Sequence, residues 1–396
     1  MKVRAILSAL LLLTVAGAAA AEDHQRTISR DFDAGIGEIR LQNLAGRVLM
    51  EGTTDGRIQV EAVVHSLEYS DHGAEAVSEL LEVEFEESRG RLDITAVYPL
   101  DETRSFRYAP DDRRRLDRGK SQMKYMGKRV TIYTGRGRGM PLWVDFHVRV
   151  PGGTSCSVRN LVGDVRFAGL AGGARADTGS GDVVAENCRG GLWADTGSGD
   201  VVVTGGEGDL DLDTGSGDVE VSDHMGEIKA DTGSGDVRLE RVKGPYANAD
   251  TGSGNIDVSD FEGRLETDTG SGDVTVRKAK GGRLDADTGS GDVRLLDVDY
   301  PDMDLDTGSG SIRVASSGDR IAHWRVDTGS GDVEFRLPET CSFRLEANTG
   351  GRVRCRFPNI DMRKVRKGRI RSLQVGDGDG LIRVSTSNGD VEILTR

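Results

Sequence analysis

The sequence predicts an all-β protein, a right-handed parallel β-solenoid of 18–19-residue coils with two strands in each coil. The phrase DTGSGDV returns nine times with little variation between Asp177 and Val333, and most copies begin 18 or 19 residues after the one before. A repeat of about 20 residues is typical of solenoids, in which each repeat stacks on its neighbours. Apolar residues alternate with polar ones on both sides of the phrase. Alternation with a period of two indicates half-buried strands.

Each repeat is too short for a βαβ unit, because the crossover alone needs a dozen or more residues. The strands must then pair with the equivalent strands of the next coil, which gives two parallel sheets facing each other across a narrow core. Val183, Val201, Val219 and Val237 should form one inward column. Connections between parallel strands of one sheet are nearly always right-handed, so we expect a right-handed coil.

Residues 1–21 are typical of a secretory signal peptide. Two basic residues precede an apolar run from Ala5 to Val15, and small residues lead to an Ala19-x-Ala21 cleavage site. The run is too short for a permanent span, and no later segment is apolar enough to cross a membrane. We expect an exported protein without a transmembrane segment in the mature chain, located in the periplasm or at the cell surface or outside the cell.

The rest of the chain divides into an N-terminal β region over residues 22–150 and the solenoid repeats over residues 151–396, with worn copies of the repeat at the C-terminal end. Apolar residues at helical spacing predict one short helix near residues 73–82, where it would cover the end of the stack. The net charge of −14, the 55 glycines and the 5% of aromatic residues suit a thin, turn-rich core rather than a globular one.

Residues 101–140 form a basic insertion with twelve Arg or Lys against five acids. A long insertion between strands is either a solvated loop or a functional segment. As a functional arm it would lie on an acidic surface of this protein or of a partner, with Arg113, Arg114 and Arg115 as candidate partner-binding residues. A second basic run covers residues 352–371. We expect no nucleic-acid binding, because the chain as a whole is acidic and exported.

Asp-Thr-Gly-Ser is also the signature of aspartic proteases, in which two carboxylates from separate lobes share a proton. Nine copies in register along one edge cannot meet in this way, so the sequence indicates no enzyme. As turn residues, the glycines supply positive φ, while the hydroxyls and the leading aspartate can cap turn amides. We assign no catalytic and no cofactor-binding residues.

The aspartates of the repeat should form two acidic ridges along one edge of the stack. The leading aspartates are Asp177, Asp195, Asp213, Asp231, Asp250, Asp268, Asp287, Asp306 and Asp327, and the trailing ones include Asp182, Asp200, Asp218 and Asp236. Like charges on neighbouring strands are destabilising, and calcium binds such carboxylates. The four trailing residues are therefore weak calcium candidates. The calcium-binding nonapeptide repeat does not match, because the aspartate stands one place too early, so capping is the favoured role.

Four cysteines remain, and an exported protein permits pairing. Cys341 and Cys355 fall on the two strands of one worn coil with the same inward phase, so a disulfide across the core is possible. Cys156 and Cys188 differ in phase and are expected to be buried thiols.

With its SGDV-type turns, its early helix and a strand ending in VRVP before the repeats, the chain resembles a widespread bacterial family of exported proteins, catalogued as a domain of unknown function and labelled putative adhesin. The likeness covers roughly residues 30–396. It implies no catalytic residues. The leading hypothesis is a non-enzymatic, adhesin-like binding or scaffolding rod of the cell envelope, with an unidentified envelope protein or polymer as partner. The alternative is an envelope-stress or regulatory sensor that acts through a membrane partner.

Overall fold

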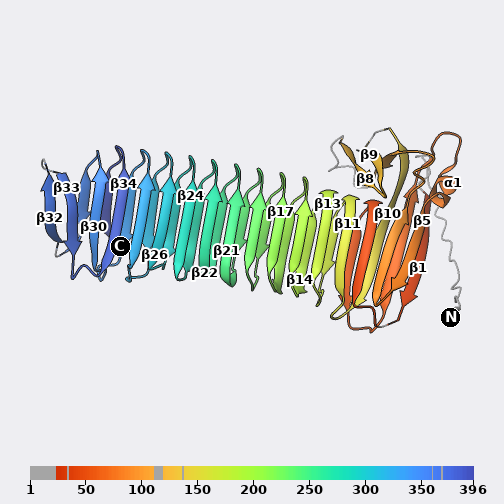
Figure 1. Ribbon diagram of the computed structural model, residues 1–396, viewed down its shortest axis with the longest axis horizontal. Coiled ribbons are helices and arrows are strands. Elements are labelled where there is room, and N and C mark those ends of the chain that lie inside the picture. The colour runs from red at the N-terminus through yellow and green to blue at the C-terminus, as the bar shows by residue number, and fades with distance from the viewer. Residues whose placement is uncertain (1–23, 34, 111–118, 136–137, 359, 367–368) are drawn as a thin grey trace, which may run out of the picture.

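The computed structural model describes residues 24–33, 35–110, 119–135, 138–358, 360–366 and 369–396. Nearly all of the elements are strands, and they stack into one elongated rod (Figure 1). Two ladders of mostly parallel strands run along the rod, and the long strand β22 takes part in both. We call them the leading sheet, whose strands precede the DTGSGDV turn, and the trailing sheet, whose strands follow it. The predicted fold class is confirmed.

In spatial order from the N-terminal end, the leading sheet contains β5 (Glu82–Ser88), β6 (Arg91–Val97), β2 (Glu38–Ala45), β11 (Ser155–Val162), β13 (Ala174–Ser180), β15 (Leu192–Thr196), β17 (Leu210–Thr214), β19 (Ile228–Thr232), β21 (Lys243–Thr251), the second half of β22 (Ile256–Thr269), β24 (Arg283–Thr288), β26 (Asp302–Thr307), β28 (His323–Thr328), β34 (Gly380–Thr386), β30 (Phe343–Thr349), β33 (Arg369–Val375) and β32 (Ile360–Arg366).

The trailing sheet contains β1 (His24–Phe32), β4 (Ile58–Ser66), β10 (Met140–Pro151), β3 (Val48–Thr53), β12 (Val165–Ala168), β14 (Val183–Arg189), β16 (Val201–Glu207), β18 (Val219–Ser222), β20 (Val237–Glu240), the first half of β22, β23 (Val274–Lys280), β25 (Val293–Val298), β27 (Ile312–Ser316), β29 (Val333–Leu337), β35 (Val391–Thr395) and β31 (Val353–Arg356).

The core lies between the two sheets and consists of in-register apolar columns. Val183, Val201, Val219 and Val237 pair in parallel as predicted, and each is fully buried. On the leading side, Ala194 lies between Ala176 and Leu212 in the register. Because the side-chain period of a strand is two, this register keeps the valines of the column inside and places the residues that alternate with them on the outer face.

The spatial order of the coils departs from chain order at the C-terminal end. The last pair of strands in the chain, β34 and β35, lies between the coil β28/β29 and the coil β30/β31 (Figure 1). The worn copy at Asn348 therefore forms the outer coil, and the final residues of the chain form the coil beneath it. Beyond β30, the antiparallel hairpin of β33 and β32 extends the leading sheet.

The N-terminal end is interleaved in the same way. The coil of β2 and β3 pairs with β11 and β12, so both sheets continue from residues 38–53 directly into the repeats. Antiparallel strands β10, β4 and β1 extend the trailing sheet, while β6 and β5 extend the leading one. The predicted helix forms as α1 (Ala74–Glu79) and packs against β1 and β4 at this end of the rod.

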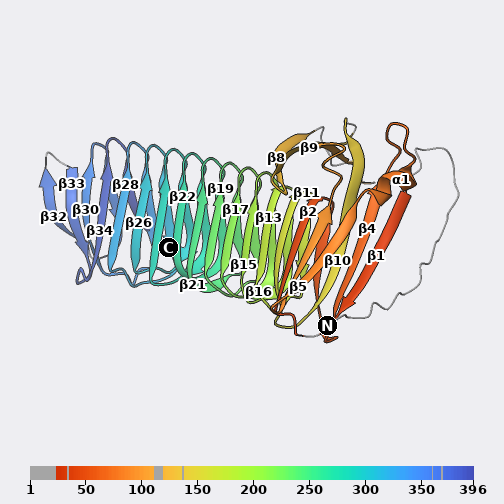
Figure 2. The ribbon, with the colours of Figure 1, turned by 45° about the vertical axis from the view of Figure 1, so that its right-hand side comes forward.

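The basic insertion is largely a folded sheet. Strands β7 (Ser105–Tyr108), β8 (Lys120–Tyr125) and β9 (Lys128–Thr134) pair with one another and with the start of β10, and they project beside the first coils (Figure 2). Phe106, Tyr125 and Ile132 are buried in it. The interpretation as a solvated loop is wrong for this part, because these three residues are buried in the same apolar core as the coils. Arg113, Arg114 and Arg115 lie outside the described residues.

Tyr125 fastens the small sheet to the stack. Its hydroxyl donates to the carbonyl oxygen of Ala96 at 2.6 Å, and a second carbonyl, that of Gln42, lies at 3.3 Å. Met123 reaches the turn of the first regular coil, since a Cβ on Gly179 would lie 2.3 Å from its methyl carbon. The small sheet therefore covers the turn edge at the N-terminal end of the repeats.

Candidate functional site

A buried threonine stabilises the turn edge in most repeats, although in the first repeat the Thr178 hydroxyl has no hydrogen-bond partner in the described structure. In one coil, the Thr214 hydroxyl donates to the carbonyl of Gly199 in the coil before it at 2.7 Å and accepts from the Gly217 amide in its own turn at 3.1 Å. The same pair of bonds recurs at Thr196, Thr232, Thr251, Thr269, Thr288, Thr307, Thr328 and Thr386. Each of these threonines thus satisfies a buried donor and acceptor that water cannot reach.

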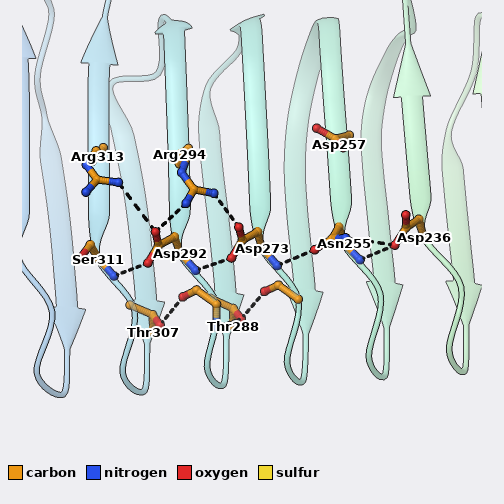
Figure 3. A network of polar contacts seen from close by, with 12 residues as sticks. Asp236, Asn255, Asp257, Asp273, Thr288, Asp292, Arg294, Thr307, Ser311 and Arg313 are labelled. Atoms are coloured by element: carbon orange, nitrogen blue, oxygen red, sulfur yellow. Dashed lines mark hydrogen bonds and ion pairs between the residues drawn. The ribbon is translucent and has the colours of Figure 1, made fainter.

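The trailing aspartates form a second ladder between coils. One side-chain oxygen of each accepts the backbone amide of the equivalent residue in the next coil, at 2.7–3.1 Å, from Asp164 through Asp182, Asp200, Asp218, Asp236, Asn255, Asp273 and Asp292 to Ser311. Figure 3 shows the part from Asp236 to Ser311. Asn255 takes an aspartate's place and still accepts the Asp273 amide at 3.0 Å. The position therefore needs an acceptor oxygen rather than a charge.

This ladder bears on the calcium candidates Asp182, Asp200, Asp218 and Asp236. Each already uses one carboxylate oxygen on the next coil, and the neutral Asn255 continues the same column. Further along, Arg294 bridges Asp273 and Asp292 at 2.6 Å each (Figure 3). Among the described residues, no three acidic, His or Cys side chains form a group suited to a metal ion.

The leading aspartates do not cap turn amides in the described structure, although the sequence predicts that they can. They pair in register from Asp177 to Asp327, one per coil, so their backbones lie about one strand spacing of 4.8 Å apart. Asp177 has Arg159 at 3.6 Å. Within the described chain, the other eight carboxylates, from Asp195 to Asp327, make neither a hydrogen bond nor an ion pair. The threonine next to each of them has taken over the capping, since it points inward to the turn.

Partial burial and the neighbouring aspartates together raise the pKa of several carboxyl groups in this column, namely Asp195, Asp213, Asp250, Asp287 and Asp306. A carboxyl group with a raised pKa in the folded state favours folding when it is protonated, and this contribution is lost as pH rises through that pKa. At neutral pH, repulsion between the charged leading aspartates therefore destabilises the stack.

Replacing Asp195, Asp213 and Asp250 together with asparagine should raise the melting temperature at pH 7. Each relieved contact is worth a few tenths of a kcal/mol. The gain over wild type should shrink as pH falls through the raised pKa of the wild-type carboxyl groups, because their charge is then lost. Thermal unfolding followed by circular dichroism across pH 4–8 checks this. A gain that stays constant with pH, or a loss of stability at pH 7, would contradict the repulsion.

At the opposite edge of the stack, by contrast, acidic and basic side chains form ion pairs. One residue per coil there has left-handed backbone, with φ between 50° and 63° at Asp223, Arg241, Asp260, Lys278 and Asp297. Arg241 binds Asp223 at 2.6 Å, Lys278 lies 3.7 Å from Asp260, and Arg396 binds Asp297 at 2.6 Å. At these positions the sign of the charge alternates from coil to coil, whereas the leading-aspartate column repeats the same negative charge.

The four cysteines are free thiols in this structure. Cys341 lies just before β30 with its Sγ 3.9 Å from the Gly318 carbonyl oxygen, and Cys355 lies on β31. Burial raises the pKa of both thiols, to about 11 for Cys341. Both are therefore protonated and weakly nucleophilic at neutral pH. A bond between them stays a prediction.

One family model matches most of the chain, including the repeats. The family described as Toastrack DUF4097 matches residues 77–280 and 207–394. The chain belongs to this Toastrack family. The resemblance inferred from the turns is thereby confirmed, and the family agrees with the observed β-solenoid. No curated protein matches the chain.

Two solved structures illustrate the Toastrack comparison. A putative lipid binding protein from Parabacteroides distasonis ATCC 8503 is 13% identical, covers 94% of this chain and 96% of its own, and gives a TM-score of 0.31. A putative adhesin from Bacteroides fragilis NCTC 9343 is 13% identical, covers 93% and 97%, and gives a TM-score of 0.25. In the part of this Toastrack chain that the structure describes, no helix is long and apolar enough to cross a bilayer.

Proposed function

We propose that this Toastrack chain is an exported, non-enzymatic binding or scaffolding rod of the cell envelope, and that its leading-aspartate column binds a basic partner. The observation that carries the proposal is the column itself. Eight carboxylates without a partner among the described residues are held in register, whereas the trailing aspartates from Asp182 to Asp292 are bonded to amides of the neighbouring coil. A rigid row of this kind suits multivalent contact with a cationic segment of an envelope protein or polymer.

The position of the charges, rather than their number, should decide binding. The Asp195, Asp213 and Asp250 triple asparagine variant removes three charges from the leading column. A matched variant with asparagine at Asp200, Asp218 and Asp236 removes three charges nearby and keeps each acceptor oxygen, as Asn255 does naturally. We expect the leading variant to bind poly-L-lysine at least about fivefold more weakly than the trailing variant, with the gap closing as salt rises.

Binding measured by isothermal titration at low and high salt checks this, and mass spectrometry of the recovered probe checks for turnover. Equal losses in the two variants would remove the leading column from the proposal, and a cleaved probe would overturn the non-enzymatic role. Export is tested separately by sequencing the N-terminus of the protein from fractionated cells. A mature chain that begins near Glu22 is expected, and one that retains residues 1–21 would contradict export.

A further inference from the structure

The two ends of the rod carry opposite charge. At the N-terminal end, residues 67–88, which run from the end of β4 through α1 and β5, contain eight Asp or Glu and no Lys or Arg. All eight acidic side chains are exposed. At the C-terminal end, the described residues 352–358, 360–366 and 369–371 contain eight Lys or Arg and one acid, Asp361. We call these the acidic end and the basic end.

Each end also finishes the leading sheet with a strand that has one free edge. Among the described residues, β5 pairs only with β6, and β32 pairs only with β33. The sequence of β5 is EVEFEES and that of β32 is IDMRKVR. The acidic side chains of β5 are exposed, and no ion pair within 4 Å involves Glu82, Glu84 or Glu86 in the described structure. Unpaired edge strands of this kind accept another strand unless something blocks them.

Strand direction allows the two edges to join. All leading strands from β6 to β30 run parallel. β5 is antiparallel to β6, whereas β32 is antiparallel to β33 and hence runs with β30. If a second copy continues the rod in the same direction, its β5 meets β32 of the first copy in antiparallel orientation. Where the two copies meet, the trailing sheet would have one strand fewer than the leading sheet. Only the two leading sheets would therefore pair across the junction.

We propose that the chain associates head to tail with further copies of itself, the β32 edge of one copy pairing with the β5 edge of the next. Charged edge strands normally prevent sheets from joining, but here the charge has opposite sign at the two ends. Two acidic ends or two basic ends repel each other, while an acidic and a basic end attract. The contact is heterologous, so it repeats along an open filament rather than closing into a dimer. This goes beyond the proposed function, because the partner is the chain itself.

Sedimentation velocity of the full chain over a range of concentrations tests the proposal. We expect oligomers of increasing length at about 50 mM NaCl that dissociate at about 500 mM, since exposed charges are screened within a few ångströms at high salt. Lysine at Glu82, Glu84 and Glu86 should weaken self-association at least about tenfold, because the edge strands β5 and β32 then both carry net positive charge. Glutamate at Arg363, Lys364 and Arg366 should do the same, because both edge strands then carry net negative charge.

A mixture of the two variants gives the decisive test. In either variant alone, the two edge strands have charges of the same sign. In the mixture, an edge strand of one variant meets an edge strand of opposite charge on the other, so the mixture should assemble where neither variant does. Circular dichroism of each variant confirms that the rod still folds. A wild-type chain that stays monomeric at low salt, or two variants that stay monomeric when mixed, would overturn the proposal. The triple asparagine variant of the leading column should keep self-association while binding poly-L-lysine more weakly, which separates this test from that of the proposed function.

Discussion

Alanine at Gly217 is expected to lower the free energy of unfolding by at least about 3 kcal/mol, the upper range for overpacking a core. Gly217 has no positive φ, so alanine would fit its backbone conformation. The obstacle is the neighbouring coil, because the new Cβ would lie 2.0 Å from the carbonyl oxygen of Gly199. That oxygen also accepts the Thr214 hydroxyl at 2.7 Å, so moving the coils apart would break the threonine bonds.

Urea unfolding followed by circular dichroism measures the effect, and Gly282 offers a matched control. A Cβ on Gly282 would meet nothing within 4 Å, and its φ is likewise not positive. Alanine there should leave stability unchanged or raise it by up to about 1 kcal/mol, through lower entropy of the unfolded chain. Similar stability for the two alanine variants would show that the close approach at Gly217 does not constrain the stack.

Removing residues 379–396 should damage the C-terminal end of the rod far more than removing the longer segment 342–378. The shorter deletion takes away β34 and β35, which pair on one side with β28 and β29 and on the other with β30 and β31. The coil of β30 and β31 then loses its parallel neighbours. The longer deletion removes only the outer coil and its hairpin, and it lets β34 and β35 follow β29 as an ordinary coil.

Hydrogen exchange of the amides in β28 and β29 distinguishes the two deletions. We expect these amides to keep their protection when residues 342–378 are removed and to lose most of it when residues 379–396 are removed, because an end coil without a neighbour frays. Urea unfolding should rank the variants in the same order. Equal protection in both would contradict the interleaved order of the coils.

The sequence reveals part of the candidate site through variation among its own repeats. Threonine follows the leading aspartate in all nine copies, whereas the trailing position is Asn255 in one copy and Ser311 in another. That contrast indicates a side chain with a fixed bond at the first position and a simpler need for an acceptor at the second. The partner of each threonine, a glycine carbonyl in the preceding coil, becomes visible only when the coils are stacked.

The repeats by themselves determine the solenoid, its two-strand coil, its in-register valine columns and the outward direction of both aspartate rows. This is possible because each coil meets a near copy of itself, so that local alternation and the period together fix every contact. The tertiary structure alone decides the order of the coils at both ends, the folding of residues 105–108 and 120–134 into a small sheet, and which of the described aspartates are bonded and which stand free. These features depend on which strand edges and amides lie close in space between segments far apart in the chain, and neither periodicity nor turn chemistry encodes that choice.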